Sequence, residues 1–339
     1  MRVAVVGTGS MGGRHAQILA GLPDVDEVLV VDADQARAAE VARQVGGRAV
    51  PHDEALEAAD AVVIATPAEL HAATVAAAVA RGLHVLCEKP LTEALASSMA
   101  IVRTVEAAGA HVEVGFHRRH DPAFVAGQRR VAGGGAGSVH LLRLTAFDPR
   151  VAPWTAERWP EGEAAPLFLH SSIHDFDLVR WMSGQEIVEV SADASGIAPG
   201  RPADPREVAT AVVRMRLSSG TLAVLEASWL HPAGYDNRVE LIADEAHLSM
   251  GHTPRTPATS VESGTVVEVQ PWAGYLDRFE DAYRAEITAF VAACRGERAP
   301  SSTARDGLEA LRAAIAATCS FVERRAVALD EIPGLPPER

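Results

Sequence analysis

Residues 2–32 read RVAVVGTGSMGGRHAQILAGLPDVDEVLVVD, and this stretch decides the fold. A short apolar run of β type leads directly into the glycine-rich turn 7–12 (GTGSMG), a helical pattern follows, and a second apolar run ends in Asp32. Strand, glycine turn, helix and strand in this order, with an acid about twenty residues after the last glycine, are typical of a dinucleotide-binding unit.

Each part of the glycine turn has a physical task in such a unit. Gly7 permits the tight turn, Gly9 lets a pyrophosphate approach the backbone, and Gly12 lets helix and strand pack closely. The start of the helix offers N–H groups and the positive end of its dipole to the phosphates. The alternative is a glycine-rich turn in a domain that binds no dinucleotide. The candidate cofactor contacts here are Gly7, Thr8, Gly9, Ser10, Met11 and Gly12.

Asp32 indicates which dinucleotide would bind. A carboxylate at the end of the second strand accepts hydrogen bonds from the ribose hydroxyls and repels a 2′-phosphate. Ala33 follows it, and Arg37 lies farther along in the next predicted helix, so no arginine stands immediately beside the acid. These features favour NAD over NADP.

Composition restricts the class of protein. A chain of 339 residues, 48% of them apolar, predicts two domains with ample core. We expect no membrane-spanning segment, and Arg2 lies in a strand pattern rather than a signal peptide. The formal charge of −14 argues against a nucleic-acid partner. Three scattered cysteines, Cys87, Cys294 and Cys319, favour a reduced, cytoplasmic setting.

Strands alternate with helices throughout residues 1–121, which predicts a doubly wound parallel sheet (Rossmann domain). Ligands of such sheets bind at the carboxyl ends of the strands. Residues 61–65 (AVVIA), 84–87 (HVLC) and 111–115 (HVEVG) are further strands. The residues expected at this edge are Thr66, Pro67, Glu88, Lys89 and Phe116, with His71 in the first turn of the helix 69–81.

A second domain, of α+β type, is predicted for residues 122–303. After a helix at 123–132, strands follow one another with few helices between them, and many alternate apolar and polar residues. This alternation predicts a large, mainly antiparallel sheet with one face on helices and one face open. The expected strands are 138–147, 186–194, 207–217, 221–230, 237–243 and 246–250.

Four segments, GTGSMG, ATPAELH, CEKP and GFHRRHDPAF, carry a resemblance in their order and spacing. The chain resembles the Gfo/Idh/MocA oxidoreductases, and most closely their inositol 2-dehydrogenase branch, over essentially its whole length. The resemblance implies NAD-dependent hydride transfer from a secondary alcohol of a cyclic polyol or sugar, bound in a cleft between the domains. It also implies a homodimer or homotetramer formed through the open sheet face, and a C-terminal helix, about 304–324, that packs back on the nucleotide domain.

The resemblance assigns roles at the strand edge. It places Lys89 between nicotinamide and substrate as a catalytic residue, often after a cis Lys-Pro peptide, and Glu88 at the nicotinamide end of the cofactor. It places Arg118 in the substrate pocket. Read without the resemblance, Lys89 would be a solvated strand-end lysine and Arg118 a surface residue of a basic loop.

A helix expected to begin near His170 carries the second part of the chemistry. At 3.6 residues per turn His170 and His174 share one face. His174 matches the family's catalytic base, whereas His170 stands where the family has an aspartate. Either His174 remains the base with His170 as a neutral partner, or alcohol oxidation is impaired. A metal at this pair with His117 or His120 is a third reading, which we do not favour because the family uses no metal.

Four further residues are candidates for contacting or enclosing the substrate. Tyr235 lies in a segment, 233–240, that resembles the Y-G-Y-D-x-R segment of inositol dehydrogenases. Asp148 anchors a Pro/Trp-rich loop, 148–166, in which Trp154 and Trp159 could form a wall of the pocket. Simple packing is the alternative for all of them.

Two other functions compete with inositol-type dehydrogenation. One is reduction of a ketosugar with NADPH. The other is a catalytically impaired protein that senses a dinucleotide or sugar, which the unusual His170 alone suggests.

Overall fold

The computed structural model describes residues 1–149, 164–196, 204, 207–253, 255 and 270–336. Two compact units divide the chain. Unit 1 comprises residues 1–120, 281–309 and 335–339, and unit 2 comprises residues 121–280 and 310–334. No helix in the described part of the chain has the length and apolar character needed to cross a membrane.

Unit 1 contains a six-stranded sheet in the order β3-β2-β1-β4-β5-β6, and every neighbouring pair is parallel. The central strands are buried on both faces, as their uninterrupted apolar sequences predict. The strands are β1 (Arg2–Val6), β2 (Glu27–Val31), β3 (Arg48–Ala49), β4 (Ala61–Ile64), β5 (His84–Cys87) and β6 (Val112–Val114).

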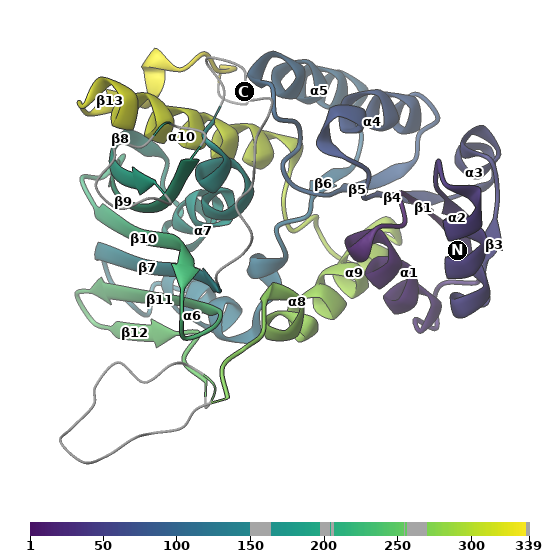
Figure 1. The fold of residues 1–339 in the computed structure, drawn as a ribbon, viewed down its shortest axis with the longest axis horizontal. Helices are drawn as coiled ribbons and strands as arrows, with labels where there is room; N and C mark the ends of the chain where they lie inside the picture. The colour runs from purple at the N-terminus through teal and green to yellow at the C-terminus, as the bar shows by residue number, and fades with distance from the viewer. Residues whose placement is uncertain (150–163, 197–203, 205–206, 254, 256–269, 337–339) are drawn as a thin grey trace. The chain divides into compact units, whose positions relative to one another are not determined.

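Helices cover both faces of this sheet. In Figure 1, α4 and α5 lie together on one face, and α1 and α9 lie on the other. The predicted doubly wound parallel sheet is therefore confirmed. The helices are α1 (Ser10–Ala20), α2 (Gln35–Val45), α3 (His52–Ala58), α4 (His71–Val79), α5 (Leu95–Ala108) and α9 (Glu280–Cys294), with short 3₁₀ turns η1 (Ala68–Leu70) and η2 (His117–His120).

Residues 281–303 belong to unit 1, whereas the sequence analysis placed them in the second domain. The apolar face of α9 accounts for the difference. Tyr283 stacks on His117 with ring centroids 4.3 Å apart, and Phe290 meets His111 edge-on at 6.1 Å. Ser302, just after α9, donates to the carbonyl of Val114 in β6. The face of α9 thus completes the core beside β6.

The last helix, α10 (Ala304–Glu323), is shared between the units, since residues 304–309 belong to unit 1 and the rest to unit 2. Thr303 caps it: its backbone N–H and its hydroxyl both donate to Asp306, whose own N–H donates back to the Thr303 hydroxyl. A reciprocal cap of this kind fixes where a helix starts.

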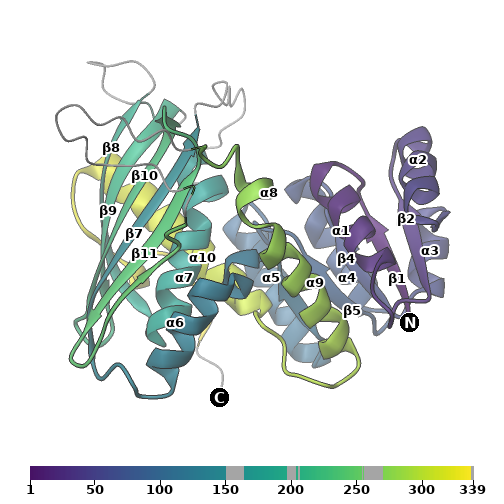
Figure 2. The same cartoon turned by 90° about the horizontal axis from the view of Figure 1, so that it is seen from below.

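Unit 2 contains a seven-stranded sheet in the order β12-β11-β7-β10-β9-β8-β13. All pairs are antiparallel except β7 with β10, which is parallel, so the sheet is mainly antiparallel as predicted. Figure 2 shows helices α6, α7 and α10 on one face of it. The strands are β7 (Val139–Pro149), β8 (Ile187–Gly196), β9 (Val208–Leu217), β10 (Leu222–His231), β11 (Asp236–Ala243), β12 (His247–Met250) and β13 (Val327–Ala328).

The helices of unit 2 are α6 (Pro122–Ala132), α7 (Ile173–Ser183) and the four-residue α8 (Tyr275–Arg278). A π-helical turn, η3 (Leu167–Ser172), leads into α7, so the helical segment begins earlier than the predicted start near His170. In a π-helical turn the backbone hydrogen bonds link residues i and i+5, whereas in an α-helix they link residues i and i+4. The spacing argument that put His170 and His174 on one face assumed a regular α-helix and does not hold across this turn.

Candidate functional site

The glycine turn between β1 and α1 has a shape that side chains would block. Gly7 has φ +90°, and a Cβ on Gly12 would lie 1.8 Å from the Gly7 carbonyl oxygen, so neither position accepts another residue without rearrangement. A Cβ on Gly9, in contrast, would meet no described atom within 4 Å. The backbone at Gly9 therefore faces open space, as close approach of a pyrophosphate requires.

The start of α1 offers backbone donors beside this space. Gly9 is the N-cap residue, and within the described chain no side chain caps the helix. The first N–H groups of a helix have no partner inside the helix and attract anions. Ser10 and Met11 form the first turn, so the predicted contact residues 7–12 lie around one cradle.

Asp32, directly after β2, is held by the glycine turn. Its Oδ2 accepts hydrogen bonds from the backbone N–H and the hydroxyl of Thr8, both at 2.7 Å, and its Oδ1 accepts one from the Asp34 N–H at 2.8 Å. Partial burial would raise the pKa of Asp32, but these bonds and the nearby Arg37 charge outweigh it and lower the pKa. The side chain is thus an oriented carboxylate with lone pairs left for ribose hydroxyls.

A cavity of about 800 Å³ lies over the carboxyl ends of β1, β2 and β4. A pocket of this size suits a nucleotide, and its walls combine apolar surface with the Asp32 carboxylate. The glycine cradle and this cavity fit the adenosine and pyrophosphate parts of NAD. Residues that line it include Gly7, Asp32, Ala33, Thr66, Pro67 and Leu70.

His71 joins the two neighbouring strand ends. Its Nδ1 lies 3.0 Å from the carbonyl oxygen of Pro90, and its Nε2 lies 2.9 Å from that of Thr66. The ring is 1% exposed. His71 therefore holds the segment after β4 against the segment after β5.

Glu88 and Lys89 follow β5 at the same edge, and the Lys89-Pro90 peptide is cis, as the resemblance implies. The buried Glu88 carboxylate lies 2.8 Å from His15 Nε2 and accepts the Lys89 backbone N–H at 3.2 Å. Burial alone would raise the pKa of Glu88, but the hydrogen bond with His15 and the charges of His15 and Lys89 together lower it. Glu88 is an anchored anion, and the Lys89 side chain is partly exposed.

Behind this edge lies a buried polar cluster, made of His15, Glu88, His117, Tyr283 and Glu286, that the sequence analysis did not predict. Burial, followed by the charges of Arg118 and Lys89, holds the pKa of His117 well below its usual value. Burial and the charges of Glu88 and Glu113 hold the pKa of Glu286 well above its usual value. The sequence pattern offers one indication: Glu286 interrupts the buried apolar stripe of α9 that Tyr283, Ile287 and Phe290 form.

Glu286 gives a prediction for stability. The carboxyl is 3% exposed, and its Oε2 has no hydrogen-bond partner among the described residues. Because its pKa is raised in the folded state, folding retains a proton that the unfolded chain releases as pH rises above the ordinary value of 4.5. We expect Glu286→Gln to increase the free energy of unfolding at pH 8 by about 1–3 kcal/mol.

The gain from Glu286→Gln should shrink as pH falls toward 5, which chemical denaturation at several pH values would measure. Glu280→Gln, on the same helix, is the matched control and should show no such trend. A gain that is independent of pH would contradict the assignment of a proton to Glu286.

In unit 2 the two predicted histidines lie close to the point where the π turn η3 leads into α7. His170 lies within η3 and is partly exposed, and His174 lies in α7 and is 5% exposed. Between them, the hydroxyl of Ser171 donates to Oδ2 of Asp148 at 3.0 Å, which ties the turn to β7. The predicted Asp148 is thus brought to the histidine segment.

The remaining candidates differ in their surroundings. Arg118 is 3% exposed in the turn η2, so its reading as a surface arginine is wrong. Tyr235 is 4% exposed, and its ring meets Phe279 edge-on at 6.1 Å, which favours the packing alternative. Trp154 and Trp159 lie outside the described residues.

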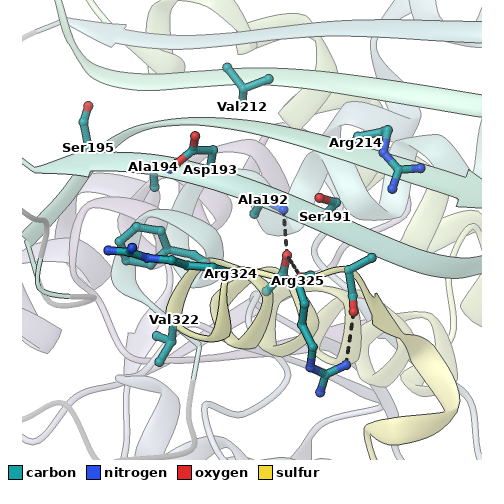
Figure 3. A pocket seen from close by; sticks show the side chains of 13 residues that line it. Ser191, Ala192, Asp193, Ala194, Ser195, Val212, Arg214, Val322, Arg324 and Arg325 are labelled. Atoms are coloured by element: carbon teal, nitrogen blue, oxygen red, sulfur yellow. Dashed lines mark hydrogen bonds between the residues drawn. The ribbon is translucent and has the colours of Figure 1, made fainter.

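A larger cavity, of about 1000 Å³, lies in unit 2 and holds none of the predicted site residues. It is bounded by β8, β9 and the end of α10 (Figure 3). There the hydroxyl of Ser320 accepts the Ala192 N–H at 2.9 Å and donates to the Arg325 carbonyl. The cavity is a groove between packed elements, and it does not contribute to the site described above.

Two family models match the chain. Residues 1–116 match the model described as "Oxidoreductase family, NAD-binding Rossmann fold", and residues 124–249 match the "GFO/IDH/MocA C-terminal domain". Together they cover most of the sequence and meet near the boundary between the units at residue 120.

Similarity to known proteins extends over nearly the whole chain. A myo-inositol dehydrogenase of Streptomyces leeuwenhoekii is 35% identical over 94% of this chain and 96% of its own. A structure of a putative myo-inositol dehydrogenase from Sinorhizobium meliloti, 29% identical, superposes with a TM-score of 0.87 over 97% and 99% of the two chains. Scyllo-inositol dehydrogenase of Lactobacillus casei, solved with NAD(H) and scyllo-inositol, is 25% identical, with a TM-score of 0.84 over 97% and 99%. The chain belongs to the Gfo/Idh/MocA family of NAD-binding oxidoreductases.

Proposed function

We propose that this protein is an NAD-dependent dehydrogenase that oxidises a secondary alcohol of an inositol or a closely related cyclic polyol. The observation that carries the proposal is Lys89, which follows β5 at the sheet edge that also holds the glycine cradle and the Asp32 carboxylate. The similarity to inositol dehydrogenases over nearly the whole chain supports the substrate class.

Each residue of the site has a separate role in the proposed reaction. Lys89 donates a hydrogen bond to the alcohol oxygen and stabilises the negative charge that develops on it. His174 removes the hydroxyl proton as general base. The glycine cradle and Asp32 orient the cofactor, while Glu88 and His71 fix the loop that carries Lys89. NAD, when bound, supplies the hydride acceptor.

A substrate screen tests this function. Full-length protein would be supplied with NAD or NADP and with inositols, aldoses and ketosugars, and turnover would be read by nicotinamide absorbance. We expect the highest kcat/KM for an inositol with NAD. Preference for a ketosugar with NADPH would favour the biosynthetic reductase instead. Tight NAD binding without turnover on any polyol would favour a sensing protein, the alternative that His170 raises.

Cofactor choice gives a second prediction. We expect Asp32→Ala to lower kcat/KM with NAD roughly tenfold to a hundredfold, because a hydrogen bond to a charged group contributes about 1.5–3 kcal/mol. Activity with NADP should rise in the same variant, since Arg37 Nη2 lies 3.7 Å from Asp32 Oδ1 and can then pair with a 2′-phosphate.

The double variant Asp32→Ala with Arg37→Ala is the control for this effect. This variant should show the same decrease in kcat/KM with NAD but no increase in activity with NADP. An unchanged ratio of the two kcat/KM values in Asp32→Ala would contradict the role of Asp32 in cofactor choice.

His170 gives a third prediction. His170→Asp, which introduces the residue that the family resemblance expects here, should keep or increase kcat on the best polyol, because in the family a carboxylate at this position supports the catalytic histidine and would stabilise the imidazolium that forms on His174. The same charge favours protonation of His174, so the acid limb of kcat/KM should move upward by about one pH unit. His170→Asn, which removes the imidazole without adding charge, should leave the limb in place. A large loss of kcat in His170→Asp would favour the impaired protein.

The sheet of unit 2 supports a homo-oligomer, as a dimer or tetramer. Val188, Val212, Leu222 and Ile242, on strands β8 to β11, are between 36% and 52% exposed. Large apolar side chains exposed on the strands of one sheet support a subunit interface there. Light scattering of the purified protein would give its subunit number.

We also propose a cytoplasmic location for the protein.

A further inference from the structure

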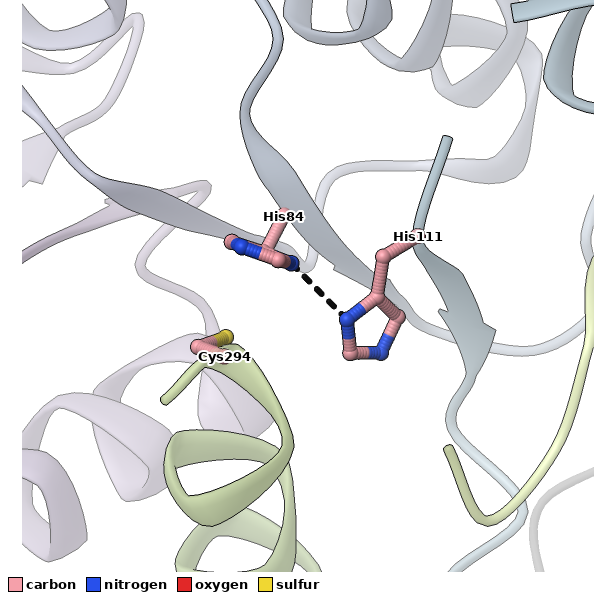
Figure 4. A group of neighbouring side chains, drawn as sticks. All are labelled: His84, His111 and Cys294. Atoms are coloured by element: carbon pink, nitrogen blue, oxygen red, sulfur yellow. Dashed lines mark hydrogen bonds between the residues drawn. The ribbon is translucent and has the colours of Figure 1, made fainter. Parts of the chain in front are cut away.

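Three potential metal ligands gather at the edge of the unit 1 sheet that is opposite the cofactor cradle. His84 is the first residue of β5, His111 directly precedes β6, and Cys294 is the last residue of α9 (Figure 4). Their ligand atoms all lie within 4.8 Å of one another, and all three side chains are partly exposed. Lys89, by comparison, follows the other end of β5, so this cluster is separate from the proposed reaction.

We infer that His84, His111 and Cys294 form a binding site for a divalent transition metal ion of the zinc type. Two imidazole nitrogens and one thiolate are ligands that zinc prefers, whereas magnesium and calcium prefer oxygen. Bond lengths of about 2.0–2.3 Å in a tetrahedron put ligand atoms about 3.3–3.7 Å apart. The two Nδ1 atoms lie 2.8 Å apart and no pair of ligand atoms is more than 4.8 Å apart, so side-chain rotation would bring the three atoms to these separations.

The two imidazoles already face each other through the atoms that would bind the metal. His84 Nδ1 and His111 Nδ1 lie 2.8 Å apart, a distance that requires one shared proton. A metal ion would take the place of this proton. The rings meet edge-on, with centroids 4.9 Å apart, so both lone pairs can point at one atom.

Glu113 orients His111 for this role. His111 Nε2 lies 2.9 Å from Glu113 Oε1, and the other carboxylate oxygen accepts the Ser301 N–H at 2.8 Å. With Nε2–H donating to this anchored, buried carboxylate, Nδ1 of the neutral ring is left with its lone pair toward the cluster. A carboxylate that accepts a hydrogen bond from a metal-binding histidine is a recurrent arrangement in metal sites. It raises the basicity of that histidine.

Helix α9 positions the thiol. Phe290, one turn before Cys294, packs against the His111 ring at 6.1 Å, so this face of the helix is fixed beside β6. Burial, followed by the charge of Glu113, raises the pKa of Cys294 to about 12, so the thiol must lose a proton when it binds a metal. Burial and the charge of His111 lower the pKa of His84, which favours the neutral form of that ring. The fourth position is left for water.

Cobalt(II) is the probe for the experiment, because a cobalt–thiolate bond gives a charge-transfer absorption band in the near ultraviolet. Full-length protein, stripped with chelator, would be titrated with Co²⁺ and then with Zn²⁺. We expect one Co²⁺ per chain, a charge-transfer band that Zn²⁺ abolishes, and tighter binding at higher pH. Zn²⁺ should also raise the Tm of the stripped protein.

Cys294→Ser and His84→Asn should each lose the band and bind at least tenfold more weakly, while Cys319→Ser, at the other partly exposed cysteine, should keep both. The Tm of each variant with chelator present checks that it is folded. A band of unchanged intensity in Cys294→Ser, or no band in the unaltered protein, would overturn the assignment. Neither result depends on dehydrogenase activity.

Discussion

Lys89→Met is expected to lower kcat by ~10²–10⁴-fold, the range for loss of one electrostatic or proton-donating group. Methionine keeps most of the side-chain volume but removes the charge and all three N–H donors. The affinity for NAD, measured by fluorescence titration, should stay nearly unchanged, because the glycine cradle and Asp32 lie after other strands, β1 and β2.

Arg81→Met is the matched control, since it removes an exposed cation at the end of α4 in the same unit and should leave kcat unchanged. Lys89→Arg should remain well below the unaltered enzyme, because a planar guanidinium does not replace a compact ammonium group. Loss of NAD affinity together with turnover in Lys89→Met would mean that Lys89 holds the cofactor and does not act on the alcohol.

His174→Gln is expected to lower kcat by a similar factor, ~10²–10⁴-fold, because glutamine cannot accept the hydroxyl proton. The residual activity should lack the acid limb that a titrating histidine gives to the pH profile of kcat/KM. This change in the pH profile would distinguish loss of the general base from loss of packing around His174, which is 5% exposed.

His140→Gln is the control for His174→Gln. His140 is an exposed histidine of unit 2, paired with Asp244 at 2.6 Å, and its replacement should alter neither kcat nor the profile. An acid limb that persists in His174→Gln would assign the base to another group, and Asp148, tied to Ser171, would then be the first residue to test.

The sequence predicted the parts of the fold that depend on local patterns. Continuous apolar runs located the buried parallel strands, and alternation located β7 to β12 to within a few residues. The glycine turn and Asp32 were predictable because their spacing follows directly from one βαβ unit. These signals all lie within about thirty residues of chain, the length of such a unit.

Features that depend on distant segments could not be predicted in the same way. The pattern of α9 indicates an apolar face but not the sheet that it covers, so residues 281–303 were assigned to the wrong side of the domain boundary. The π turn before α7 is a backbone feature that residue spacing does not reveal. His84, His111 and Cys294 are far apart in the chain, and no local spacing links them.

The discontinuity of unit 1 has a consequence for biosynthesis. A nascent chain that has emerged as far as residue 280 contains every strand of the nucleotide sheet but lacks α9, which packs beside β6. Domains generally fold as units. Unit 1 therefore cannot complete its core, and this apolar surface stays uncovered, until α9 has also left the ribosome. A transcript cut short before α9 encodes no complete NAD-binding domain.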